Sequence, residues 1–125
     1  MTAPVWMSAV IGDFGRSAGL KGLALNERGA VALNFETGAT FRMEYTGSEL
    51  VMAMTFPSAD LKRLLSLAHP DARYGFRIRA GLLSRKGEAV VATRLLEREV
   101  TMPRLNAAFG VLWRLAGETG GATWA

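Results

Sequence analysis

Hydrophobic and polar positions divide this 125-residue chain into helical and strand-like segments. At its start, apolar residues recur every four positions over residues 4–19, which places them on one face of a helix. These residues are Trp6, Val10, Phe14 and Ala18. Three glycines in the same segment weaken its intrinsic helix propensity. We therefore expect a helix that is held in place by packing against the rest of the domain.

Residues 22–45 alternate between apolar and polar, the period of a half-buried strand. Turn residues at 26–29 (Asn-Glu-Arg-Gly) and at 37–38 (Thr-Gly) divide the segment into three strands. The apolar side consists of Leu23, Leu25, Val31, Leu33, Phe35, Phe41, Met43 and Tyr45. The polar side includes Asn34, Glu36, Arg42 and Glu44. An antiparallel meander with one solvent-facing side is therefore expected.

The next strand, ELVMAMTFP at 49–57, is apolar or small on both faces. Leu50, Met52, Met54 and Phe56 alternate with Val51 and Ala53. A two-layer domain buries one face of its sheet and leaves the other in water. Because Val51 and Met52 cannot both point into one core, the pattern predicts that a partner chain covers the second face.

The second half of the chain predicts a short helix, two strands and a final helix. Ser58 is a plausible N-cap for a helix over 59–68. Strands are expected at 74–82 and 88–96, and the last helix follows Thr101 with Pro103 in its first turn. The element order is α-β-β-β-(β)-α-β-β-α, which predicts one α+β domain over 1–117 with an antiparallel sheet and three helices. Residues 118–125 are expected to form a flexible tail.

Composition narrows the possible functions. The chain has no cysteine, which excludes disulfides and thiolate metal sites. No apolar run approaches the roughly 20 residues that span a bilayer, and the apolar start lacks the charged residues of a secretory signal. Among residues 1–61 there are four basic and six acidic residues, whereas residues 62–104 hold ten basic and four acidic ones. We expect a cytoplasmic protein whose basic half faces an acidic partner, an acidic half of a dimer or nucleic acid.

Residues suited to catalysis are few. His69, the single histidine, lies at a predicted helix end, where the helix dipole stabilises a cation, and Asp71 belongs to the same turn. The acidic residues are scattered singly, and no glycine-rich phosphate-binding motif occurs. We therefore expect no enzymatic activity, no metal and no cofactor. Aromatic residues are not interleaved with the basic ones, which disfavours a base-stacking nucleic-acid surface.

The number of apolar residues in three of the predicted elements instead indicates a protein-interaction surface. The segments 50–56, 61–68 and 74–82 are more apolar than so small a domain readily buries. Met43, Met52 and Met54 suit an adaptable surface, although Met43 and Met54 are equally explained as core fillers. Two further functions stay open for this chain: a non-catalytic α+β interaction module of another kind, and a basic nucleic-acid-binding dimer.

Several stretches resemble a known family. They are GLALNERGAVALNFE, GSELVMAMTFP, GFRIRAGLL, GEAVVATRL and LNAAFGVLWRLA. Over roughly residues 5–116, the chain resembles the class I chaperones of bacterial type III secretion, the Tir-chaperone family. GSELV together with GEAVVATRL looks most like the subgroup that serves the secretion gatekeeper protein. The estimated pI of about 10.1 departs from the usual acidity of this family and points to an acidic client or partner chaperone.

The resemblance implies a cytoplasmic bacterial dimer of α+β protomers, each with a strongly twisted sheet. Such a chaperone binds the N-terminal segment of a secreted protein, its client, in extended form and keeps it soluble and secretion-competent. By this resemblance the client contacts Val10, Phe14, Leu33, Phe35, Met43 and Met52. The dimer interface falls on Leu61, Leu64, Leu65, Phe76 and Ile78. Members of the gatekeeper subgroup pair with a second small chaperone, so a homodimer and a heterodimer both stay open, as does the client's identity.

Overall fold

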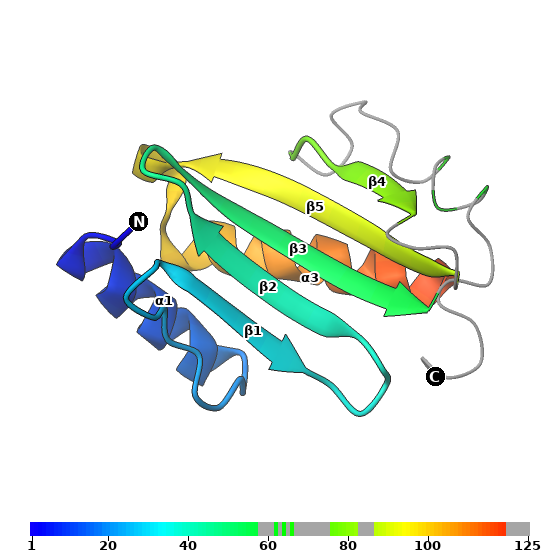
Figure 1. Cartoon of the computed structure of the whole chain (residues 1–125), viewed down its shortest axis with the longest axis horizontal. Coiled ribbons are helices and arrows are strands. Elements are labelled where there is room, and N and C mark those ends of the chain that lie inside the picture. The colour runs from blue at the N-terminus through cyan, green and yellow to red at the C-terminus, as the bar shows by residue number, and fades with distance from the viewer. Residues whose placement is uncertain (58–61, 63, 65, 67–75, 83–86, 120–125) are drawn as a thin grey trace.

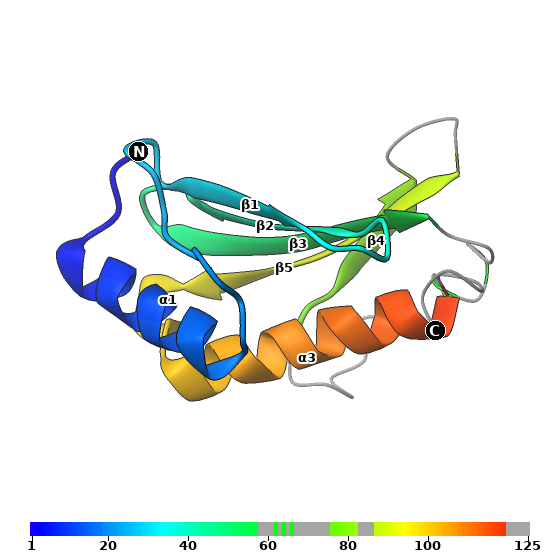
Figure 2. The ribbon, with the colours of Figure 1, turned by 90° about the horizontal axis from the view of Figure 1, so that it is seen from below.

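The computed structural model of the chain describes residues 1–57, 62, 64, 66, 76–82 and 87–119. These residues form a five-stranded antiparallel sheet with both described α-helices on one of its faces (Figures 1 and 2). In chain order the elements are α1 (Val5–Ser17), β1 (Ala30–Asn34), β2 (Thr40–Tyr45), β3 (Glu49–Pro57), β4 (Arg79–Leu82), β5 (Glu88–Leu96), the 3-10 helix η2 (Glu97–Glu99) and α3 (Met102–Thr119). The strand order in the sheet is β1-β2-β3-β5-β4. The predicted α+β class with an antiparallel sheet is confirmed.

Helices α1 and α3 cover one face of the sheet and enclose the core (Figure 2). The predicted helix at the start of the chain forms, but its buried face differs from the prediction. Met7, Ile11 and Phe14 are fully buried, whereas Trp6 is 46% exposed. The reason is that a spacing of four and then three residues follows the helical period of 3.6 more closely than a strict spacing of four.

The meander begins one strand later than predicted. Residues 20–25 form no strand, because the chain returns closely along α1 with Gly19 and Gly22 at positive φ angles of 73° and 74°. Leu23 packs so tightly on α1 that a Cβ added at Gly15 would lie 2.8 Å from the Leu23 Cβ. The predicted turn at 26–29 does form, and it leads into β1.

Strand β3 lies at the centre of the sheet, between β2 and β5. Its side chains Leu50, Met52, Met54 and Phe56 are buried under the helices. On the opposite face Val51 and Ala53 are only half-buried. The apolar character of both faces therefore has two causes: a deep core on one side and small side chains on the other. The side chain of Met52 does not reach the second face.

The region before β4 differs from the sequence-based expectation. Strand β4 begins at Arg79, and the buried residues Phe76 and Ile78 precede it outside the ladder. The predicted helix over 59–68 lies mostly outside the described residues, although Lys62, Leu64 and Ser66 are helical and Leu64 is fully buried. Helix α3 extends to Thr119, and the rest of the predicted tail lies outside the described residues. Within the described part of the chain, no helix is long and apolar enough to cross a membrane.

Candidate functional site

One edge of the sheet is formed by β1, which pairs with β2 alone among the described strands. An edge strand presents main-chain N–H and C=O groups to which another extended chain can bind. The apolar side chains Val31 and Leu33 are half-buried on the helix-covered side of the sheet, and Phe35 follows directly after the strand. The edge of β1 and these three apolar side chains therefore lie side by side.

An aromatic cluster connects this edge to the core. Its members are Phe14, Phe35, Phe41, Phe109 and Trp113. The ring centroids of Phe35 and Trp113 are 5.2 Å apart in an edge-to-face arrangement, and Trp113 stacks on Phe109 at 5.8 Å. Phe109 in turn meets Phe41 of β2 at 4.9 Å, also edge to face. These are the spacings at which aromatic pairs attract one another beyond simple burial.

The cluster runs from the interior to the surface. Phe14 and Phe41 are fully buried, Phe35 and Phe109 are half-buried, and Trp113 is 37% exposed. The exposed part of Trp113 is thus held by rings that are themselves anchored in the core. We call the half-buried side chains of Leu33, Phe35 and Phe109 with Trp113 the edge surface. It combines a rigid apolar floor with a free strand edge.

The residues that the resemblance assigned to client binding divide into two groups. Val10, Leu33 and Phe35 are half-buried and offer surface to another molecule. Phe14, Met43 and Met52 are 0–1% exposed and fill the protein's own core. A side chain buried to this degree contacts another chain only if the core opens, so these three offer no surface to a client.

Trp113 and Phe109 were not among the sequence-predicted site residues. Both belong to the apolar stripe of α3, which also contains the fully buried Leu105, Leu112 and Leu115. That stripe is wider than a helix needs in order to pack against a sheet. Its width is the sequence feature that could have indicated a surface role for Phe109 and Trp113. Only the packing of Phe35 against Trp113 distinguishes the surface side of the stripe from its core side.

The residues that the resemblance assigned to a dimer interface also lie inside the protomer where they are described. Leu64, Phe76 and Ile78 are buried, and Leu61 and Leu65 lie outside the described residues. The guanidinium of Arg104 covers the Phe76 ring at 4.2 Å from its centroid. On the neighbouring edge strand β4, Leu82 is 57% exposed.

The titratable groups of the described residues form no catalytic arrangement. The Tyr45 hydroxyl lies 3.1 Å from the Glu97 carboxylate and 3.0 Å from the Gly47 carbonyl oxygen. Burial, and then the hydrogen bond to Glu97, raise the pKa of Tyr45 above its ordinary value. This contact ties β2 to η2 and is structural. No group of three potential metal ligands occurs in the described part of the chain, and His69 lies outside it.

Several solved structures share this fold. The ExsC-ExsE complex includes a chain that matches with a TM-score of 0.69 and 18% identity, covering 93% of this chain and 92% of that one. The HopA1-SchA chaperone-effector complex matches with a TM-score of 0.68 and 17% identity, covering 91% and 92%. The Yersinia pestis type III secretion chaperone SycH, in complex with a fragment of YscM2, matches with 0.68 and 18%, covering 90% and 98%. The fold is that of the type III secretion chaperones.

A family model identifies the chain more closely. The model described as type III secretory system chaperone SycN matches residues 6–119. The chain belongs to this family, and the resemblance to type III secretion chaperones is confirmed. No curated protein sequence matches the chain. The protein is therefore a type III secretion chaperone.

Proposed function

We propose that this chaperone binds the N-terminal segment of one secreted client in extended form, on the edge surface, and keeps it secretion-competent in the cytoplasm. The observation that carries the proposal is the exposed Trp113, packed on Phe35 beside the open edge of β1. Two structures with the same fold support it: one is a chaperone-effector complex, and the other is a chaperone bound to a fragment of another protein.

The physical basis is strand addition. An extended client segment beside β1 forms main-chain hydrogen bonds with the strand edge, which require no particular sequence. Alternate side chains of that segment point to the helix-covered side of the sheet, where they meet Leu33, Phe35 and Trp113. Apolar area removed from water there contributes about 25 cal/mol per Å². The backbone thus supplies affinity, and the aromatic floor selects segments with apolar residues at every second position.

We further propose that the chaperone works as a dimer through the edge of β4 at Leu82. The support is Leu82, a largely exposed leucine on the second edge strand of the sheet. The exposed leucine and the edge backbone of β4 are both suited to contact with another protomer. The partner is a second copy of this chain or a second small chaperone, and the client is an effector or the secretion gatekeeper.

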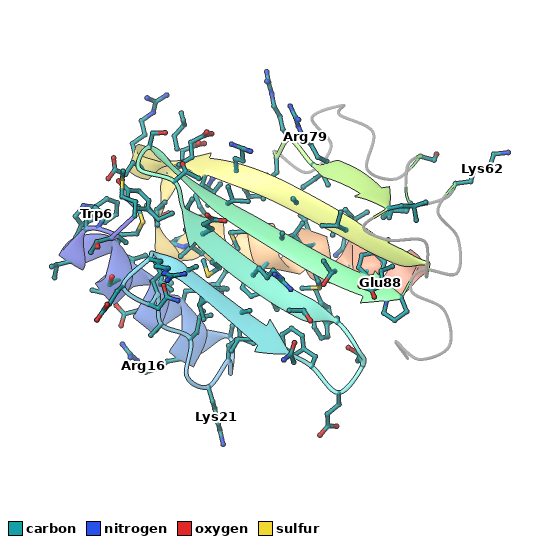
Figure 3. All side chains as sticks on the ribbon, in the orientation of Figure 1. Trp6, Arg16, Lys21, Lys62, Arg79 and Glu88 are labelled. Carbon is teal, nitrogen blue, oxygen red and sulfur yellow. The ribbon has the colours of Figure 1, made fainter. Side chains whose placement is uncertain are left out.

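A pull-down from the native cytoplasm tests the client site. We expect the tagged wild-type protein to retain one secreted protein through its N-terminal region, and Trp113→Ala to lose it. Trp6→Ala is the matched control, because Trp6 is exposed to a similar degree but lies at the start of α1, at the other end of the molecule from the second half of α3 (Figures 2 and 3). Equal retention by the wild type and by Trp113→Ala would contradict the proposed site.

A further inference from the structure

A groove of about 490 Å³ lies on the face of the sheet that α1 and α3 leave uncovered. Its apolar floor consists of Val51, Ala92 and Leu96 from the central strands β3 and β5. Glu49, Arg94 and Arg79 line the same groove and alternate with the core residues of their strands. The groove therefore occupies the second, non-core face of the strand at 49–57.

The acidic residues of this groove are already paired. Glu49 accepts a hydrogen bond from Arg94 at 3.4 Å. Glu99 accepts from the Leu96 backbone N–H at 2.8 Å with one oxygen and from Arg104 at 3.4 Å with the other. The two carboxylates of the groove are thus already paired with Arg94, with Arg104 and with a backbone N–H group.

Two arginines of the groove have no such partner. Arg77 and Arg79 are exposed, and neither forms an ion pair with any carboxylate of the described residues. Arg79 projects from β4 beyond the edge of the sheet (Figure 3). Among the described residues, the result is a groove with an apolar floor and positive charge that no carboxylate pairs with along one side. Its ligand should carry carboxylates beside apolar groups.

The pairing between strands places a further arginine, Arg42, on the same face of the sheet. One row on this face reads Arg42, Ala53, Ala92 and Arg79, from β2 to β4. Two small side chains thus separate two arginines over about three strand spacings, or about 14 Å. This spacing accommodates an extended polypeptide between Arg42 and Arg79.

We propose that this groove, with the row from Arg42 to Arg79 beside it, binds an acidic, extended stretch of the client, which rests on the client-binding function proposed above. Carboxylates of that stretch pair with Arg77 and Arg79, and its apolar side chains cover Val51 and Leu96. The basic charge of the second half of the chain then has a role: it selects an acidic segment and accelerates its capture.

The composition of the groove favours a polypeptide over nucleic acid. Its described lining contains no aromatic side chain on which a base could stack. Its apolar floor of Val51, Ala92 and Leu96 also suits the apolar side chains of a peptide, whereas a nucleic-acid backbone is charged at every phosphate.

Fluorescence anisotropy with a defined probe tests the proposal. The probe is a labelled peptide in which glutamate alternates with valine, compared with the same peptide carrying lysine for glutamate. We expect the wild-type protein to bind the acidic probe more tightly than the lysine probe, with an advantage that falls as salt rises. The Arg77→Glu/Arg79→Glu protein should bind it about tenfold more weakly, the loss expected for two exposed ion pairs.

The matched control is Lys21→Glu/Arg114→Glu, which carries the same change in net charge at exposed sites outside the groove. Equal weakening by both double variants would overturn the proposal, because net charge alone would then explain binding. It would also be overturned by an unlabelled single-stranded oligonucleotide that binds more tightly than the peptide, or by loss of the dimer in the Arg77→Glu/Arg79→Glu protein. None of these results affects client capture that depends on Trp113, so the two proposals fail separately.

Discussion

At the scale of single residues, Gly29 fixes the turn that leads into β1. It has a φ of +73°, which a residue with a Cβ rarely adopts, and an added Cβ would collide with the Met1 carbonyl oxygen. The Asn26 side chain completes the turn by accepting hydrogen bonds from the N–H groups of Arg28 and Ala30. The position of the edge strand thus depends on one glycine and one asparagine.

Replacing Gly29 by alanine should lower the free energy of unfolding by about 1–2 kcal/mol, because the left-handed conformation becomes strained. Urea denaturation at a fixed protein concentration measures the change. Gly110→Ala serves as the control, since an added Cβ at this exposed position of α3 meets no atom within 4 Å. It should raise the same free energy by about 0.4–1 kcal/mol. Similar stability of the two variants would contradict this account of the turn.

Tyr45 gives a prediction for alkaline pH. Because its pKa is raised in the fold, the neutral phenol stabilises the native state below the ordinary pKa of 10.0, and this contribution is lost as pH rises through the higher folded value. We expect the stability difference between the wild type and Tyr45→Phe to be constant around neutral pH and to shrink above pH 10. Chemical denaturation at a series of pH values measures it. A difference that changes already near pH 7 would show that another group is responsible.

At the scale of elements, the central strands β2, β3 and β5 were predictable because their alternation is long and regular. The strand expected at 22–25 was wrong, because the close packing of Leu23 on Gly15 is a tertiary contact that alternation does not reveal. The edge surface was predictable in part. Leu33 and Phe35 stand out in the sequence, whereas the role of Trp113 follows only from the way α3 crosses the sheet near β1.

The edge strand β4 provides a test of the proposed dimer. We expect Leu82→Asp to give a folded monomer, because Leu82 is largely exposed in the protomer and a charge there is costly only in an interface. Sedimentation velocity reports the assembly, and far-ultraviolet circular dichroism reports the fold. Leu64→Asp is the contrasting variant: Leu64 is fully buried, so its replacement should unfold the protomer itself. A Leu82→Asp protein that remains dimeric would place the interface elsewhere.

At the scale of the whole molecule, the two proposed contact regions reach opposite edges of the sheet, which are β1 and β4 (Figure 1). The edge surface adjoins β1, and Arg79 of the basic groove belongs to β4. Four strand spacings of about 4.8 Å separate β1 from β4, a distance of about 19 Å that about six extended residues span. One client segment bound at both places therefore needs at least about six residues between its apolar and its acidic stretch.

This spacing is testable on the captured client. Overlapping synthetic peptides that cover its N-terminal region should include one set that requires Trp113 and a second set that requires Arg79. The second set should lie at least about six residues from the first. If every binding peptide depended on the same one of these two residues, the client would use a single surface.

The central claim is that the client joins the sheet at the edge of β1. Amide hydrogen exchange of the chaperone with and without its captured client tests it directly. Because strand addition supplies hydrogen-bond partners to edge amides, we predict slower exchange in residues 31–33 and around Trp113 when the client is bound. Unchanged exchange at 31–33, with protection confined to other parts of the chain, would contradict the account.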